Sequence, residues 1–131
     1  MSPQFEKIKQ LVLGKKYDLS VAFLSPTEMR KVDKKYPHPI NPDVSVGVPT
    51  KASGNKASNV LAFPLSDTSG EILLCRDTAE KQAPLYHMSK RTFVTYLFIH
   101  GLLHLRGFDH SVTMEDEERR IMKKFGLRTH E

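Results

Sequence analysis

The first apolar residues of the chain recur at the spacing of an amphipathic helix. They are Phe5, Ile8, Leu11 and Val12. Ser2 is a preferred N-cap residue, Pro3 is tolerated in the first helical turn, and Gly14 is suited to the end of a helix. The pattern therefore predicts a helix that begins after Ser2, ends at Gly14 and covers one face of a sheet.

The next apolar run, residues 19–24, predicts a β-strand. Ser25 and Glu28 have the spacing of a capping box, so we expect a second helix to begin there. This helix must stop near Tyr36 because Pro37 cannot continue it.

Residues 37–58 contain four of the eight prolines of the chain, together with several Gly, Asn and Ser residues. This composition predicts a long, turn-rich loop. Val44, Val46 and Val48 alternate as they would in a short edge strand. Loops of this length are uncommon unless they are functional or disordered.

Two apolar runs follow, at residues 60–65 and 71–75. The segment between them is too short to hold a crossover helix, so we expect the two strands to form an antiparallel hairpin. The strand at residues 19–24 precedes a helix, which predicts that the three strands form a mixed sheet.

Residues 89–105 are apolar on almost every side, which predicts a central buried helix. A last helix is expected to begin with a cap at residues 113–116. Its charged residues from 115 to 120 are interpreted as a solvated face. The predicted fold is α+β, with residues 1–131 forming one domain in which a small mixed sheet packs with about four helices.

Lys and Arg outnumber Asp and Glu by 20 to 15, which gives a formal charge of +5. This excess is expected of a protein that binds a polyanion, although a solvated basic surface would give the same count. The single cysteine, Cys75, cannot form an internal disulfide and ends an apolar strand, so we interpret it as a core residue. No segment has the pattern of a signal peptide or membrane span, which predicts a cytoplasmic protein without membrane contact.

The most informative motif is the run from His100 to His110, which spaces three imidazoles for one metal ion. Positions four apart lie on the same face of a helix, so His100 and His104 can bind one ion. Gly107 can end the helix and turn the chain so that His110 returns as a third ligand. Three histidines leave one tetrahedral position of a zinc ion open, as in catalytic sites, and the metal site would lie at the end of the central helix. Nickel, copper and iron also accept imidazole ligands.

The same histidine spacing occurs in metzincin metalloproteases, where a glutamate follows the first histidine as general base. Here that position is Gly101, so this base is missing and a metallopeptidase is the less favoured alternative.

The complete motif, H-G-L-L-H-L-R-G-F-D-H from His100 to His110, resembles the signature of the YbeY family. Residues 59–64 (N-V-L-A-F-P) and 70–74 (G-E-I-L-L) resemble two strands of that family, with Ala62 where Ser is usual. The segments at residues 19–25 and 28–36 resemble its first strand and second helix. This resemblance implies a metal-dependent endoribonuclease, with one Zn²⁺ ion per chain or alternatively Ni²⁺ or Fe. It further implies that the protein acts with ribosomal particles in ribosomal RNA maturation and ribosome quality control.

The chain departs from the family between Tyr36 and Asn59, where it has no arginine to match the functional arginine of the family. Lys51 or Lys56 can replace it as a point charge without the paired hydrogen bonds of a guanidinium group, or both can be ordinary surface lysines. Asp109 is interpreted as a residue that orients a ligand imidazole, with general base and turn cap as alternatives. A metal-stabilised ribosome-binding factor without catalytic activity is the third candidate function.

Overall fold

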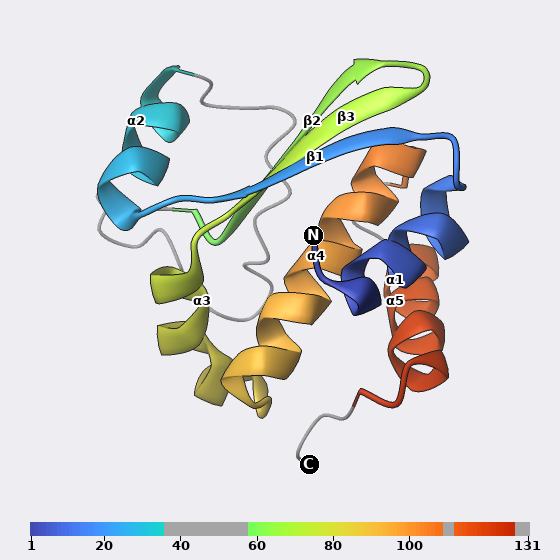
Figure 1. Cartoon of the computed structure of the whole chain (residues 1–131). Helices are drawn as coiled ribbons and strands as arrows, with labels where there is room; N and C mark the ends of the chain where they lie inside the picture. Colours follow the sequence, from blue (N-terminus) through green and yellow to red (C-terminus); the bar gives the residue numbers. More distant parts are fainter. Residues whose placement is uncertain (36–57, 109–111, 128–131) are drawn as a thin grey trace.

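The computed structural model describes residues 1–35, 58–108 and 112–127 (Figure 1). In chain order the elements are α1 (Pro3–Leu13), β1 (Asp18–Phe23), α2 (Pro26–Lys35), β2 (Val60–Ser66), β3 (Ser69–Leu74), α3 (Arg76–Gln82), the 3₁₀ helix η1 (Ala83–Tyr86), α4 (Lys90–Arg106) and α5 (Val112–Lys124). The predicted α+β class is confirmed. The expected edge strand around Val46 lies outside the described residues.

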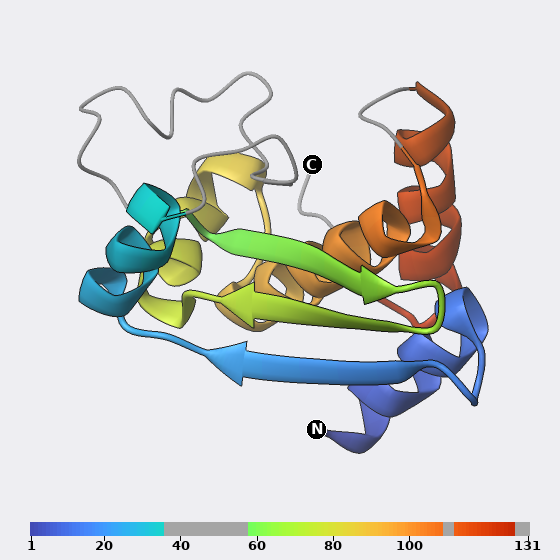
Figure 2. The ribbon, with the colours of Figure 1, turned by 90° about the horizontal axis from the view of Figure 1, so that it is seen from above.

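The described strands form one sheet in the order β1-β3-β2, with β1 at one edge (Figure 2). β2 and β3 pair antiparallel, which confirms the predicted hairpin, and only Asp67 and Thr68 separate them. β1 pairs with β3 in parallel, from Asp18 opposite Ser69 to Phe23 opposite Leu74. The sheet is therefore mixed, as the helix between the first two strands predicts.

The two faces of the hairpin are covered by different helices because successive side chains of a strand point to opposite faces. Val60 and Ala62 of β2 belong to the large core around α4. Leu61 between them belongs to a smaller core with Met29 of α2 and Cys75. Figure 1 accordingly shows α2 and α4 on opposite sides of the strands. Cys75 is fully buried, which confirms its interpretation as a core residue.

α4 is the central helix of the molecule and contacts α1, α3, α5 and both strands of the hairpin. Its fully buried apolar residues on several sides explain why its sequence is apolar almost all round. α1 packs mainly on α4, where Phe5 and Phe98 stack with ring centroids 4.0 Å apart. The main packing partner of the first helix is therefore α4, and not the face of the sheet that the sequence pattern predicts.

The predicted helix starts have the expected hydrogen bonds. The hydroxyl group of Ser2 accepts from the backbone N–H of Phe5 at 3.2 Å. In the capping box, the N–H of Glu28 donates to Ser25 Oγ at 3.1 Å, and the N–H of Ser25 donates to Glu28 Oε1 at 2.9 Å. These bonds satisfy backbone donors that have no partner within the helix.

Two differences from the sequence prediction concern helices. α3 and η1 were not expected, because their buried residues Ala79 and Ala83 are small and give little apolar periodicity. With α3, the described residues hold five α-helices rather than about four. α5 begins at Val112, so Thr113 lies inside the helix and the expected cap at residues 113–116 is wrong. None of these helices is long and apolar enough to cross a membrane.

Candidate metal centre

His100 and His104 lie one turn apart on the same face of α4. Their ring centroids are 4.8 Å apart, and the ring planes meet at 71°. His100 is buried and His104 is half-buried. The two imidazoles that the sequence predicts to approach each other therefore do so.

Gly107 ends α4 in the left-handed conformation, with φ of 106°. Its N–H donates to the carbonyl of His104 at 3.0 Å, and the N–H of Phe108 donates to the carbonyl of Leu103 at 2.9 Å. A β-carbon at this φ would be strained, so glycine suits the turn. The predicted end of the helix between the second and third histidines is confirmed.

The other residues predicted for the site lie outside the described residues. They are Asp109, His110, Lys51 and Lys56. Within residues 1–35, 58–108 and 112–127, no group of three or more metal-binding side chains comes together. The three-histidine site therefore stays a prediction, of which the structure describes two members.

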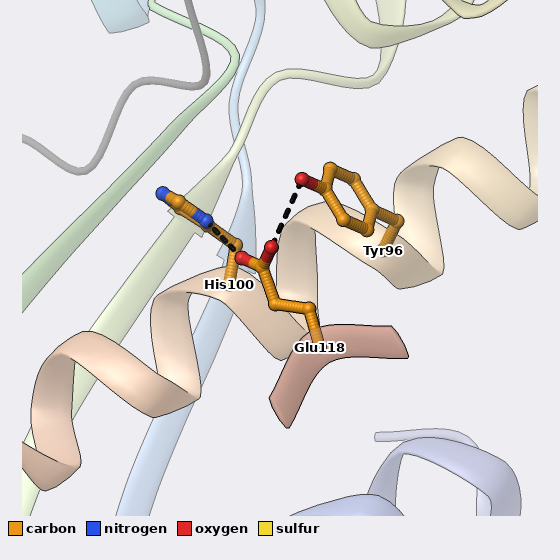
Figure 3. A network of polar contacts seen from close by, with 3 residues as sticks. All are labelled: Tyr96, His100 and Glu118. Carbon is orange, nitrogen blue, oxygen red and sulfur yellow. Dashed lines mark hydrogen bonds and ion pairs between the residues drawn. The ribbon is translucent and has the colours of Figure 1, made fainter. Parts of the chain in front are cut away.

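The structure adds a buried carboxylate that the sequence interpretation missed. Glu118 of α5 is only 3% exposed, and one of its oxygens accepts a hydrogen bond from His100 Nδ1. Its other oxygen accepts from the hydroxyl group of Tyr96 at 3.2 Å (Figure 3). The prediction that residues 115–120 form a solvated face is therefore wrong at this position.

Tyr96 completes this network from the preceding turn of α4. Burial raises the pKa of its phenol well above the ordinary value, and the negative charge of Glu118 raises it further. The phenol therefore stays protonated at neutral pH and donates to the carboxylate. This second hydrogen bond helps to hold the carboxylate in a buried place, where an unpaired charge would be costly.

The partner of His100 Nδ1 determines which nitrogen of that ring can bind a metal. An ionised carboxylate can only accept hydrogen bonds, so the tautomer of His100 that fits this contact has its proton on Nδ1, and Nε2 is then the nitrogen that suits a metal ion. Histidine ligands of metal ions commonly donate their second ring nitrogen to a carboxylate in this way. His100 and His104, with Glu118 bonded to His100 Nδ1, thus fit part of a metal centre with imidazole ligands.

Gly101 follows His100 on α4, and the packing of α4 on the sheet leaves little room for a side chain at this position. A β-carbon at this position would lie 3.2 Å from Cδ1 of Ile72 in β3, which is tighter than usual carbon contacts. Glycine lets α4 pack closely on the sheet. The position occupied by a general base in metzincins therefore serves helix packing here.

A sequence signal for Glu118 exists. In α5 the buried residues Met114, Ile121 and Met122 mark one helix face. Glu118 lies on the same face, four residues after Met114 and four residues before Met122. A carboxylate on an otherwise apolar stripe needs a polar partner. The surrounding charges at Glu117 and Arg120 obscured this signal.

Three other residues with side chains able to take part in chemistry lie elsewhere in the described part of the chain. His87 has φ of 58° and ends η1 as a turn residue. Cys75 Sγ lies 3.2 Å from the hydroxyl oxygen of Thr78. Arg106 is exposed at the last position of α4. His38 and His130 lie outside the described residues.

The family model described as endoribonuclease YbeY matches residues 49–127. A protein named endoribonuclease YbeY from Finegoldia magna is 28% identical over 123 residues, which cover 85% of this chain and 71% of the relative. One of the same name from Mesoplasma florum is 33% identical over 111 residues, which cover 84% of this chain and 63% of the relative.

A solved structure shares the fold. The solution structure of a protein from Thermotoga maritima superposes with a TM-score of 0.61 at 21% identity, covering 94% of this chain and 80% of that chain. The arrangement of the sheet and helices is therefore one that is already observed in a solved structure.

Proposed function

Because this chain belongs to the YbeY endoribonuclease family, we propose that it is a metal-dependent endoribonuclease that cleaves single-stranded RNA. Its proposed substrate is ribosomal RNA in ribosomal particles, during ribosomal RNA maturation and ribosome quality control. That substrate would place the protein in the cytoplasm. The family name of the relatives supports the reaction, and the basic charge of +5 supports an anionic substrate.

The observation that carries this proposal is the buried carboxylate of Glu118 against Nδ1 of His100. The proposed metal ligands are His100, His104 and His110, which would hold one Zn²⁺ ion, with Ni²⁺ or Fe as alternatives. When bound, the ion would supply Lewis acidity and an activated water at neutral pH.

The residues of the chain have separate tasks in this proposal. Glu118 keeps the proton on His100 Nδ1 and fixes the orientation of the ring, while Tyr96 anchors the carboxylate. Asp109 is proposed to orient a second imidazole. Lys51 or Lys56 is proposed to neutralise charge that develops on the phosphate oxygens during cleavage.

A cleavage assay separates this function from its two alternatives. Purified protein is incubated with single-stranded ribosomal RNA or with an unstructured protein, with and without a chelator. We expect the RNA alone to be cut, and only without chelator. Cleavage of the protein substrate would favour a metallopeptidase. Binding to ribosomal particles without cleavage of either substrate would favour a ribosome-binding factor.

A further inference from the structure

A groove of about 800 Å³ lies at the other end of α4 from the histidines. It is bordered by the N-terminal ends of α1, α3 and α4 and by the end of β1. Residues that line it from α4 include Arg91, Val94 and Thr95. At about 100° per residue, the stripe from Arg91 to Thr95 points away from the stripe that holds Tyr96, His100 and His104. The groove is therefore separate from the candidate metal centre.

β1 runs along this groove as an edge strand with open backbone groups. The N–H of Asp18 donates to the carbonyl of Thr68, so the even-numbered residues of β1 point their backbone groups toward β3. The N–H and carbonyl groups of Leu19, Val21 and Phe23 therefore point outward. In the part of the chain that the structure describes, no strand pairs with this edge (Figure 2).

Apart from the exposed Asp18 at its start, the edge lacks the features that usually protect an exposed strand. The sequence of β1, D-L-S-V-A-F, contains no lysine and no proline, and β1 pairs with β3 without a bulge. The side chains of Val21 and Phe23 line the groove beneath the edge. An added strand would thus find backbone partners at the edge and an apolar floor for its alternate side chains.

The groove is also positively charged. Arg76, Lys90 and Arg91 line it, against one acidic residue, Glu80. Lys90 and Arg91 begin α4, whose first turn contains no acidic residue. Cations are unfavourable at the positive end of a helix, so their charge adds to that of the helix dipole. The combined field favours an anionic partner.

We propose that this groove binds an acidic, extended peptide segment of another protein, which adds as a strand to the outer edge of β1. Phe23 is 44% exposed, and the guanidinium group of Arg76 lies 4.3 Å from the centre of its ring. Exposed aromatic and arginine side chains are typical anchors of protein interfaces.

The same contacts favour a peptide over a nucleic acid or a second copy of this chain. Arg76 covers a face of the Phe23 ring on which a nucleic acid base would stack. Nucleotides also lack the regularly repeated N–H and carbonyl groups that an added strand offers along the whole edge of β1. A second copy of this chain would bring another positively charged groove to this one, and like charges oppose such pairing. An acidic strand satisfies both the backbone edge and the charge.

Binding of a short peptide with blocked ends, in which Val and Glu alternate, tests this proposal by fluorescence anisotropy with the full chain. We expect saturable binding that weakens as salt is added. A peptide in which Lys replaces Glu, and a Val-Glu peptide with N-methyl groups on the ladder-forming amides, should not bind. Equal binding of all three peptides would overturn the proposal.

Variants of the chain locate the binding. Arg76→Glu should weaken binding about tenfold or more, because it reverses a charge in the groove. Val21→Pro removes an outward N–H that the pairing with β3 does not use, and it should also weaken binding. Lys16→Glu makes the same charge change at an exposed turn outside the groove and should bind as wild type does.

Other results would assign the groove differently. If Lys16→Glu weakens binding as much as Arg76→Glu, the peptide senses only net charge and the proposal is wrong. If a single-stranded RNA binds in an Arg76-dependent manner and the Val-Glu peptide does not, the groove is a nucleic-acid site. If the chain dimerises in sedimentation and Val21→Pro abolishes the dimer, the partner is a second copy. Should Val21→Pro fail to fold, the N-methylated peptide tests the same hydrogen bonds.

Discussion

At the scale of single residues, the contact between Glu118 and His100 joins α5 to α4 through two residues that are eighteen positions apart in sequence. The carboxylate is buried and is held by Tyr96 as well. Removing its charge while keeping its shape should leave the fold in place but disturb the orientation and basicity of the imidazole. Metal affinity is therefore the property that this contact controls most directly.

We expect Glu118→Gln to weaken Zn²⁺ binding by about 10- to 100-fold, because partners of ligand histidines typically contribute that much. Affinity is measured by competition with a chromogenic chelator. Glu115→Gln is the matched control, since Glu115 is exposed on the same helix. Equal affinities for the two variants would show that Glu118 has no role toward a metal ion.

The lysines proposed to act on the substrate give a second prediction at this scale. If Lys51 or Lys56 stabilises developing negative charge, its change to Ala should lower the rate of RNA cleavage and leave metal content unchanged. The change to Arg should preserve or raise the rate. Two Lys→Ala variants that cleave as fast as wild type would show that both lysines are ordinary surface residues.

How far the candidate site could be predicted depended on whether its residues are close in sequence. His100 and His104 approach each other because helix geometry alone brings them together, and Gly107 ends the helix as its conformation requires. Glu118 comes from another helix, so only the packing of α5 on α4 brings it to His100. Long-range contacts of this kind are not contained in local sequence patterns.

At the scale of elements, α4 packs closely on β3 at Gly101. A β-carbon there would lie 3.2 Å from Ile72 Cδ1. Gly101→Ala gains about 1 kcal/mol of helix propensity and requires Ile72 to move by a few tenths of an ångström. Gly101→Leu adds a much larger side chain to a closely packed core.

We expect Gly101→Ala to be close to neutral in unfolding free energy and Gly101→Leu to cost about 1–3 kcal/mol, measured by urea denaturation. Combining either change with Ile72→Val, which removes the contacting Cδ1, should reduce its cost. If the cost is the same in both backgrounds, the contact with Ile72 is not its cause.

The capping box of α2 gives a prediction about pH. The backbone N–H of Ser25 lowers the pKa of Glu28, and the Ser25 side chain lowers it further. A lowered pKa in the folded state means that stabilisation is complete above the ordinary glutamate value of about 4.3 and is lost as pH falls through the folded-state pKa. Glu28→Gln should therefore lower the Tm at neutral pH, and the difference should close in acid. A difference that stays constant across this range would contradict a contribution from the charge.

The elements that could be predicted share strong local signals. Two apolar runs joined by a short turn predicted the hairpin of β2 and β3, and caps at Ser2 and Ser25 marked helix starts. α3 was missed because alanine supplies its buried contacts. Its short length is stable only through packing on α4, which is a tertiary effect.

At the scale of the whole molecule, α4 organises two separate surfaces. One face holds His104 and also His100, which contacts Glu118 of α5, and the opposite face borders the basic groove under β1. The proposed nuclease reaction and the proposed peptide partner therefore use different sides of one buried helix. A variant in the groove should leave RNA cleavage unchanged, and a variant at His104 should leave peptide binding unchanged.

The most direct test of the proposed metal-dependent nuclease is the cleavage rate of single-stranded RNA as metal-free protein is titrated with Zn²⁺, for wild type and His104→Ala, with metal content determined by elemental analysis. We predict that the wild-type rate rises until about one ion is bound per chain. His104→Ala should retain little metal and cleave far more slowly. Equal metal content and equal cleavage in the two proteins, or full activity of metal-free wild type, would contradict the account.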